Sequence, residues 1–244
     1  MMTLPEPLLP FTALDITALL VLLGAWAGVG FRIEHPGHNV SITVLMAQYR
    51  HAWMAQLLDR EQRIFDAASL QNLRQGTAFF ASTCLLSIGG VLALAGNPAP
   101  LEEAAARLPG TDGTALIWQA KLLLTVALLT SGFLRFVWAH RLFGYFSVVI
   151  GSIPNDRSAP HAQHRATQAA WLNTRAAINF NRGLRAIYFA LASLAWLLGA
   201  YALIGASLVT AAILWGREFS SISRNVLIDD APPRPDPLTK DRHP

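Results

Sequence analysis

Residues 114–138 read TALIWQAKLLLTVALLTSGFLRFVW, an apolar run in which Lys121 and Arg135 are the charged residues. Such a run is typical of a transmembrane helix, since about 20 residues at about 1.5 Å each cross the hydrocarbon core of a bilayer. Three similar apolar stretches lie at 11–31, 77–96 and 184–216. The sequence therefore predicts an all-α, multi-pass bundle of transmembrane helices.

The composition agrees with a membrane location. Of the 244 residues, 53% are hydrophobic and only 14% are charged, which suits a chain with a large lipid-facing surface. No polar segment is long enough for a separate soluble core, so we expect a single integral membrane domain over residues 1–222. The proline-rich and charged residues 223–244 are expected to form a disordered tail.

The arginines are distributed unequally among the polar segments, and this predicts the orientation. The connections 32–76 and 139–183 are rich in arginine, whereas 97–113 contains only Arg107. Because basic connections tend to stay in the cytoplasm, we expect these two inside and the N-terminus outside. A bacterial inner (plasma) membrane is the expected location. The net charge of +4 then favours anionic lipid headgroups as partners, and no nucleic-acid motif is present.

The last apolar stretch is too long for one straight crossing and too short for two. We favour one long, tilted crossing, which gives four crossings in all and leaves the tail outside. A break at Gly199 or Gly205 would instead form a hairpin and return the tail to the cytoplasm.

Two cytoplasmic amphipathic helices are predicted from helical periodicity, at about 43–75 and 163–183. In the first, the large apolar residues that fall near one side are Met46, Tyr49, Trp53, Leu57 and Ile64 or Phe65. Periodicity leaves open whether this helix lies in the headgroup layer or extends the second span into the cytoplasm.

Small residues in two spans predict close helix packing. Gly24 and Gly28 form a small-xxx-small motif in the first span, and Gly89 and Gly90 could offer a matching surface in the second. The partner is either a helix of the same bundle, which we favour, or another subunit.

Polar residues at membrane depth are the remaining candidates for a site. Asp15 and Lys121 lie near the outer ends of their spans, and Arg135 lies near an inner end. For Asp15 and Lys121, the alternatives are an element that binds an ion or proton, a structural salt bridge, and side chains that snorkel to the outer interface. A second group approaches the inner ends of two spans as one predicted polar cluster or lipid-headgroup site, namely Arg50, Asn72, Arg74, Arg175, Asn179 and Arg182.

Catalytic signatures are missing from the sequence. It contains no nucleophile elbow, P-loop, zinc-protease motif or dinucleotide fingerprint, and its single cysteine lies in an apolar span. The histidines have no accompanying ligand pattern. We therefore expect no enzymatic activity, no cofactor and no bound metal.

Several short motifs resemble the family known as domain of unknown function 599. They are Arg50-His-Ala-Trp53, the run LQNLRQGT at 70–77 and Phe80-Ala-Ser-Thr83, within a similarity over about residues 12–222. The resemblance implies a membrane protein and brings no established activity, cofactor or catalytic residue.

The leading hypothesis is therefore a structural or accessory membrane protein, oligomeric or within a complex, whose basic cytoplasmic face contacts anionic lipid. The alternative is a small-solute or ion transporter or channel built around Asp15 and Lys121.

Overall fold

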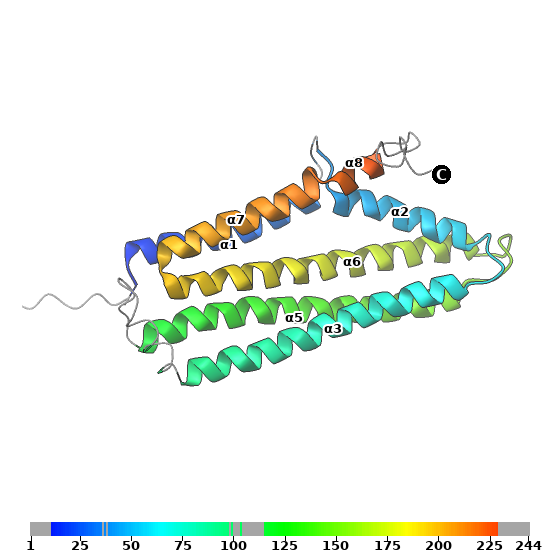
Figure 1. The fold of residues 1–244 in the computed structure, drawn as a ribbon. Coiled ribbons are helices and arrows are strands. Elements are labelled where there is room, and N and C mark those ends of the chain that lie inside the picture. Colours follow the sequence, from blue (N-terminus) through cyan, green and yellow to red (C-terminus); the bar gives the residue numbers. More distant parts are fainter. Residues whose placement is uncertain are drawn as a thin grey trace, which may run out of the picture.

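The computed structural model describes residues 11–35, 37, 39–97, 99, 103 and 115–228. The elements are α1 (Ala13–Glu34), α2 (Ile42–Leu57), α3 (Ile64–Gly96), α5 (Ala115–Gly151), α6 (Ala162–Ser193), the 3-10 helix η1 (Leu194–Leu198), α7 (Ala200–Phe219) and α8 (Ile222–Ile228). Helices α1, α5 and α7 run in one direction and α3 and α6 in the other (Figure 1). The predicted all-α fold is confirmed.

Four segments are long and apolar enough to cross a membrane: α1, α3, α5 and the segment 200–228. With 22 and 20 residues, α1 and α7 extend about 33 and 30 Å, which matches the thickness of the hydrocarbon core. Helices α3 and α5, with 33 and 37 residues, are longer and continue past the ends of α1 and α7 together with α2 and the first half of α6 (Figure 1).

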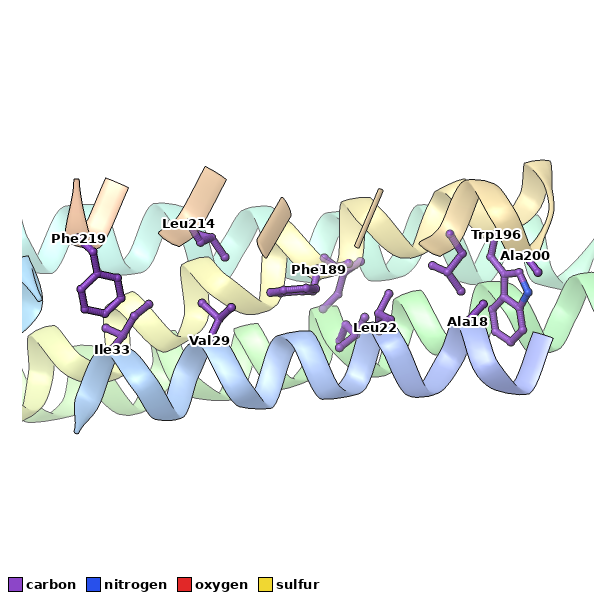
Figure 2. Close-up of a cluster of buried hydrophobic side chains, with 13 residues drawn as sticks. Ala18, Leu22, Val29, Ile33, Phe189, Trp196, Ala200, Leu214 and Phe219 are labelled. Carbon is purple, nitrogen blue, oxygen red and sulfur yellow. The ribbon is translucent and has the colours of Figure 1, made fainter. Parts of the chain in front are cut away.

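Apolar contacts join α1 to α7 from one end to the other and also to the second half of α6. Figure 2 shows Ile33 beside Phe219 at one end of this cluster and Ala18 beside Trp196 and Ala200 at the other. Helices α1 and α7 therefore begin at the same end of the bundle and finish side by side at the opposite end. We call the level of Ile33 and Phe219 the inner ends of the helices, following the predicted orientation.

Helix α6 lies at the centre of the bundle, where it packs against α5 along its length and also against α1, α2 and α7. Much of its buried surface is alanine, a small side chain that lets neighbouring helices approach closely. At Gly183 an added Cβ would lie 2.7 Å from the ring of Phe136 on α5. The contact between α5 and α6 therefore requires a residue without a side chain at this position.

The last apolar stretch is broken, so the single long crossing that the sequence favoured is wrong. Residues 184–193 complete α6, η1 follows, and the chain reverses at Gly199 before α7 begins. Gly199 has φ 116°, a left-handed conformation that favours glycine because it has no Cβ. The alternative of a hairpin is confirmed at Gly199, whereas Gly205 lies inside α7. The hairpin places the end of α7 beside the end of α1.

The predicted helix at 43–75 is also two helices. Helix α2 ends at Leu57, the chain turns through 58–63, and α3 begins at Ile64. Leu57 and Leu58 are buried at the end of α2. The residues that follow, 59–63, read DREQR, and these polar residues form the turn. Ile64 and Phe65 are 73% and 66% exposed, and they do not share the buried side of α2.

The second predicted cytoplasmic helix, at 163–183, forms the first part of α6. Of the predicted tail, residues 223–228 belong to α8 instead. Most of the predicted outer loop at 97–113, and the chain from 229 onward, lie outside the described residues.

Candidate anion site at the inner ends of the helices

A pocket of about 210 Å³ opens between α1 and α5, with α6 as its floor. We call it the arginine pocket, and its lining is Trp26, Ala27, Gly30, Phe31, Glu34, Ser131, Arg135, Arg182 and Arg185. Glu34 is the last residue of α1, so the pocket lies at the inner ends of the helices.

Glu34 joins two of the arginines. Its Oε1 accepts hydrogen bonds from Arg182 Nε at 2.8 Å and from Arg185 Nη2 at 2.5 Å, and its Oε2 accepts one from Arg182 Nη2. The side chains of Arg185 and Glu34 are 7% and 15% exposed, whereas that of Arg182 is 37% exposed. Arg182 and Arg185 are three residues apart on α6, so both side chains face α1.

Arg135 is the least engaged of the three arginines. It is exposed, and its Nη1 donates one long hydrogen bond of 3.4 Å to Asn179 Oδ1. Asn179 in turn donates from Nδ2 to the carbonyl oxygen of Arg175 within α6. Most of the hydrogen-bonding capacity of the Arg135 guanidinium therefore remains available to a molecule in the pocket.

The charges around the pocket do not cancel. Three arginines and one glutamate line it, and Glu218 also interacts electrostatically with Arg185. Glu218 itself is bound by the first turn of α2, where Thr43 N donates to its Oε2 at 3.1 Å. When Glu218 is included, one positive charge is in excess, which equals the charge of one phosphodiester.

The predicted polar cluster is divided among several places. Asn179 and Arg182 lie at the arginine pocket, whereas Asn72 lines a groove between α2 and α3. Arg74 shares a surface pocket of about 620 Å³ on α3 and α5 with His140. Arg175 is exposed on α6.

Arg50 is the remaining member of that cluster, and it lies on α2, away from the arginine pocket. Burial lowers the pKa of its guanidinium. The six residues therefore do not form one site.

Asp15 and Lys121, which the sequence predicts at membrane depth, both lie beside Trp196 at the other end of the bundle. Asp15 forms a capping box with Thr12 at the start of α1, and Asp15 Oδ1 accepts a hydrogen bond of 2.7 Å from Trp196 Nε1. Lys121 Nζ lies 5.1 and 5.9 Å from the ring centroids of Trp118 and Trp196. These contacts connect α1 and α5 to η1.

The glycines singled out in the sequence do not contact another helix within the described chain. An added Cβ at Gly24, Gly28, Gly89 or Gly90 would meet no described atom within 4 Å. These four positions therefore lack the close helix approach that is seen at Gly183, and the surface that they pack against stays a prediction.

Two charged residues of the arginine pocket were missed by sequence reasoning, Glu34 and Arg185. A usable signal was present, because Glu34 lies three residues after the first predicted span and Arg185 follows Arg182 by three residues. Their pairing joins positions 151 residues apart, and no local pattern reveals such a contact.

Comparison with known proteins gives one family match. A family model described as "Protein of unknown function, DUF599" matches residues 17–223. No curated protein and no solved structure matches the chain at a significant level.

Proposed function

Because the chain belongs to the protein family of unknown function DUF599, whose description names no activity, we propose a function from the arginine pocket. The protein is an integral membrane protein that binds the phosphate of an anionic lipid at the inner ends of its helices. The observation that carries this proposal is the excess of arginine over carboxylate in a pocket that opens between α1 and α5.

The chemistry of the pocket fits a phosphodiester. Arginine presents a planar set of N–H donors that matches the oxygens of a phosphate, and such charge-assisted hydrogen bonds are stronger than neutral ones. Arg135 supplies free donors, while Arg182 and Arg185 are held in place by Glu34. Phe31, which is 65% exposed, lies at the edge of the pocket, where an acyl chain would leave it.

The orientation that we propose supports the same function. With 97–113 outside and the arginine-rich connections in the cytoplasm, the pocket faces the cytoplasmic leaflet of the plasma membrane, where anionic lipids attract basic segments. The hairpin at Gly199 brings the inner end of α7, with Arg217, to the same side.

Native mass spectrometry of the protein in mild detergent tests the proposal. Phosphatidylglycerol is added at increasing concentrations, with phosphatidylcholine as the uncharged comparison. Arg135→Gln should raise the Kd for phosphatidylglycerol at least about tenfold, because one charge-assisted hydrogen bond contributes about 1.5–3 kcal/mol. Arg141→Gln is the matched control: Arg141 lies further along α5, and its Nε donates to Tyr145 Oη.

Two results would contradict lipid binding. The first is equal occupancy by phosphatidylglycerol and phosphatidylcholine, and the second is an equal loss in the two variants. Titration with inorganic phosphate distinguishes a lipid headgroup from a soluble anion, since a site for a free anion would be saturated by phosphate at the same concentrations.

An accessory role within an oligomer is our second proposal. Its support is that Gly24, Gly28, Gly89 and Gly90 are exposed on α1 and α3 with open space where a side chain would lie, and glycine is enriched where helices of different subunits approach closely. Native mass spectrometry across a concentration series tests it, and a monomer at every concentration with no co-purifying protein would contradict it. The transport alternative has less support, since Asp15 and Lys121 both engage Trp196.

A further inference from the structure

A groove of about 700 Å³ lies between α2 and α3, on the part of the bundle that continues past the inner ends of α1 and α7. Three aromatic side chains line it, Tyr49, Trp53 and Phe65, together with Gln56 and Asn72. Tyr49 and Phe65 are 47% and 66% exposed. Exposed aromatic rings gathered in one groove are typical of a binding surface.

The buried carboxylate of Asp66 fixes two of the side chains that line the groove. Asp66 Oδ1 accepts hydrogen bonds from Trp53 Nε1 at 2.6 Å and from Arg60 Nη1 at 2.5 Å, and Asp66 is fully buried. The ring of Trp53 also meets Phe146 edge to face at 6.2 Å. These contacts fix one wall in advance, so a ligand does not have to order it.

The last described helix ends at the edge of this groove. Tyr49 Oη donates a hydrogen bond of 3.3 Å to the carbonyl oxygen of Leu227 in α8, and α8 lies beside α2 (Figure 1). The chain that follows α8 therefore starts beside Tyr49, one of the residues that line the groove.

The sequence that follows has the composition of a polyproline II ligand. Residues 231–237 read APPRPDP, with Pro232 and Pro235 three residues apart, which is one turn of a polyproline II helix. Aromatic grooves with neighbouring hydrogen-bond donors are recurrent receptors for such segments. Gln56 and Asn72 supply those donors here.

We propose that residues 231–237 bind in the groove between α2 and α3 of the same chain, with proline rings against Tyr49, Trp53 and Phe65. At about 3.1 Å per residue, residues 229–237 span about 28 Å, enough to follow the groove from its edge. The short connection raises the effective concentration of the segment to the millimolar range, so even a weak interaction is occupied.

Disulfide cross-linking in the full chain tests the proposal, in a Cys84→Ala background because Cys84 is the sole cysteine. Arg234→Cys is combined either with Gln56→Cys, in the groove, or with Gln48→Cys. Gln48 is exposed on the same helix next to Tyr49 but does not line the groove. After copper phenanthroline oxidation, we expect at least fivefold more intramolecular disulfide with the groove position.

A second variant separates specific binding from chance encounters. Pro232→Ser with Pro235→Ser should lower the groove cross-link to the level of the control pair, while the helical bundle is left unchanged. The proposal is overturned by equal yields from the two pairs, by a groove yield that the proline substitutions leave unchanged, or by cross-linked dimers in place of monomers, which would assign the groove to a second copy.

Discussion

The substitution Glu34→Gln should destabilise the protein and, at the same time, increase its response to anionic lipid. Glu34 is the carboxylate that Arg182 and Arg185 share. Removing one partner of a buried ion pair costs about 3–5 kcal/mol, because the remaining charge stays buried without compensation. Arg182 is 37% exposed and water screens its charge, so we expect the lower end, about 3 kcal/mol.

Thermal unfolding in a mild detergent measures this effect. A chain of this size shifts its midpoint by about 2–4 °C per kcal/mol, which gives a decrease of about 6–12 °C for Glu34→Gln without lipid. Phosphatidylglycerol should restore more of the midpoint in the variant than it adds to the unsubstituted protein, since the phosphate replaces the missing carboxylate. Phosphatidylcholine should not.

Two controls make the result specific. Asp59→Asn removes a surface ion pair with Arg157, in which the side chains are 43% and 66% exposed, and should cost less than about 1 kcal/mol. Adding Arg185→Met to Glu34→Gln removes the buried charge that has lost its partner, and should restore most of the decrease in the unfolding midpoint. A Glu34→Gln decrease no larger than that of Asp59→Asn would refute the reasoning, and so would equal restoration by the two lipids.

Three further substitutions, the first with a matched control, test the packing in thermal unfolding. Gly183→Ala forces a methyl group into the facing phenylalanine ring and should cost about 1–3 kcal/mol; Gly24→Ala, in open space, should cost nothing in detergent, and a similar loss in both would be inconsistent with this account. Gly199→Ala should cost about 1–3 kcal/mol at its positive φ, and an unchanged midpoint would argue against the hairpin. Trp196→Phe removes the hydrogen bond to Asp15 and should cost about 1–2 kcal/mol; an unaltered midpoint would show that this bond is not stabilising.

The parts of the fold that local patterns determine were predictable from the sequence. The first three apolar stretches each overlap one long helix, α1, α3 or α5, and begin no more than two residues before it, because hydropathy and length are read along a continuous segment. The sequence divided α6 between a cytoplasmic helix and an apolar span, because its first half is polar and its second half is apolar. Hydropathy does not tell whether an apolar surface is covered by lipid or by the protein's own helices.

The candidate site was predicted in part for a related reason. Arg135, Asn179 and Arg182 were selected because each lies near the inner end of a span. Glu34 and Arg185 were not, since their roles depend on which helices become neighbours. Gly24 and Gly28 depend on the rest of the fold in the same way: a small-residue motif indicates that a close approach is possible but does not identify the partner, and open space surrounds both positions within the described chain.

The central position of α6 has a consequence for biosynthesis. Among the described helices, α1, α3, α5 and the segment 200–228 are apolar enough to leave an aqueous translocation channel on their own, but α6 does not meet the same length and hydropathy criteria. Its arginines and asparagines would be costly in lipid before α1 and α5 are present to receive them. Residues 184–219 should therefore enter the bilayer as a pair of joined helices, with α7 providing the hydrophobicity that draws α6 in, and only after the preceding spans have gathered.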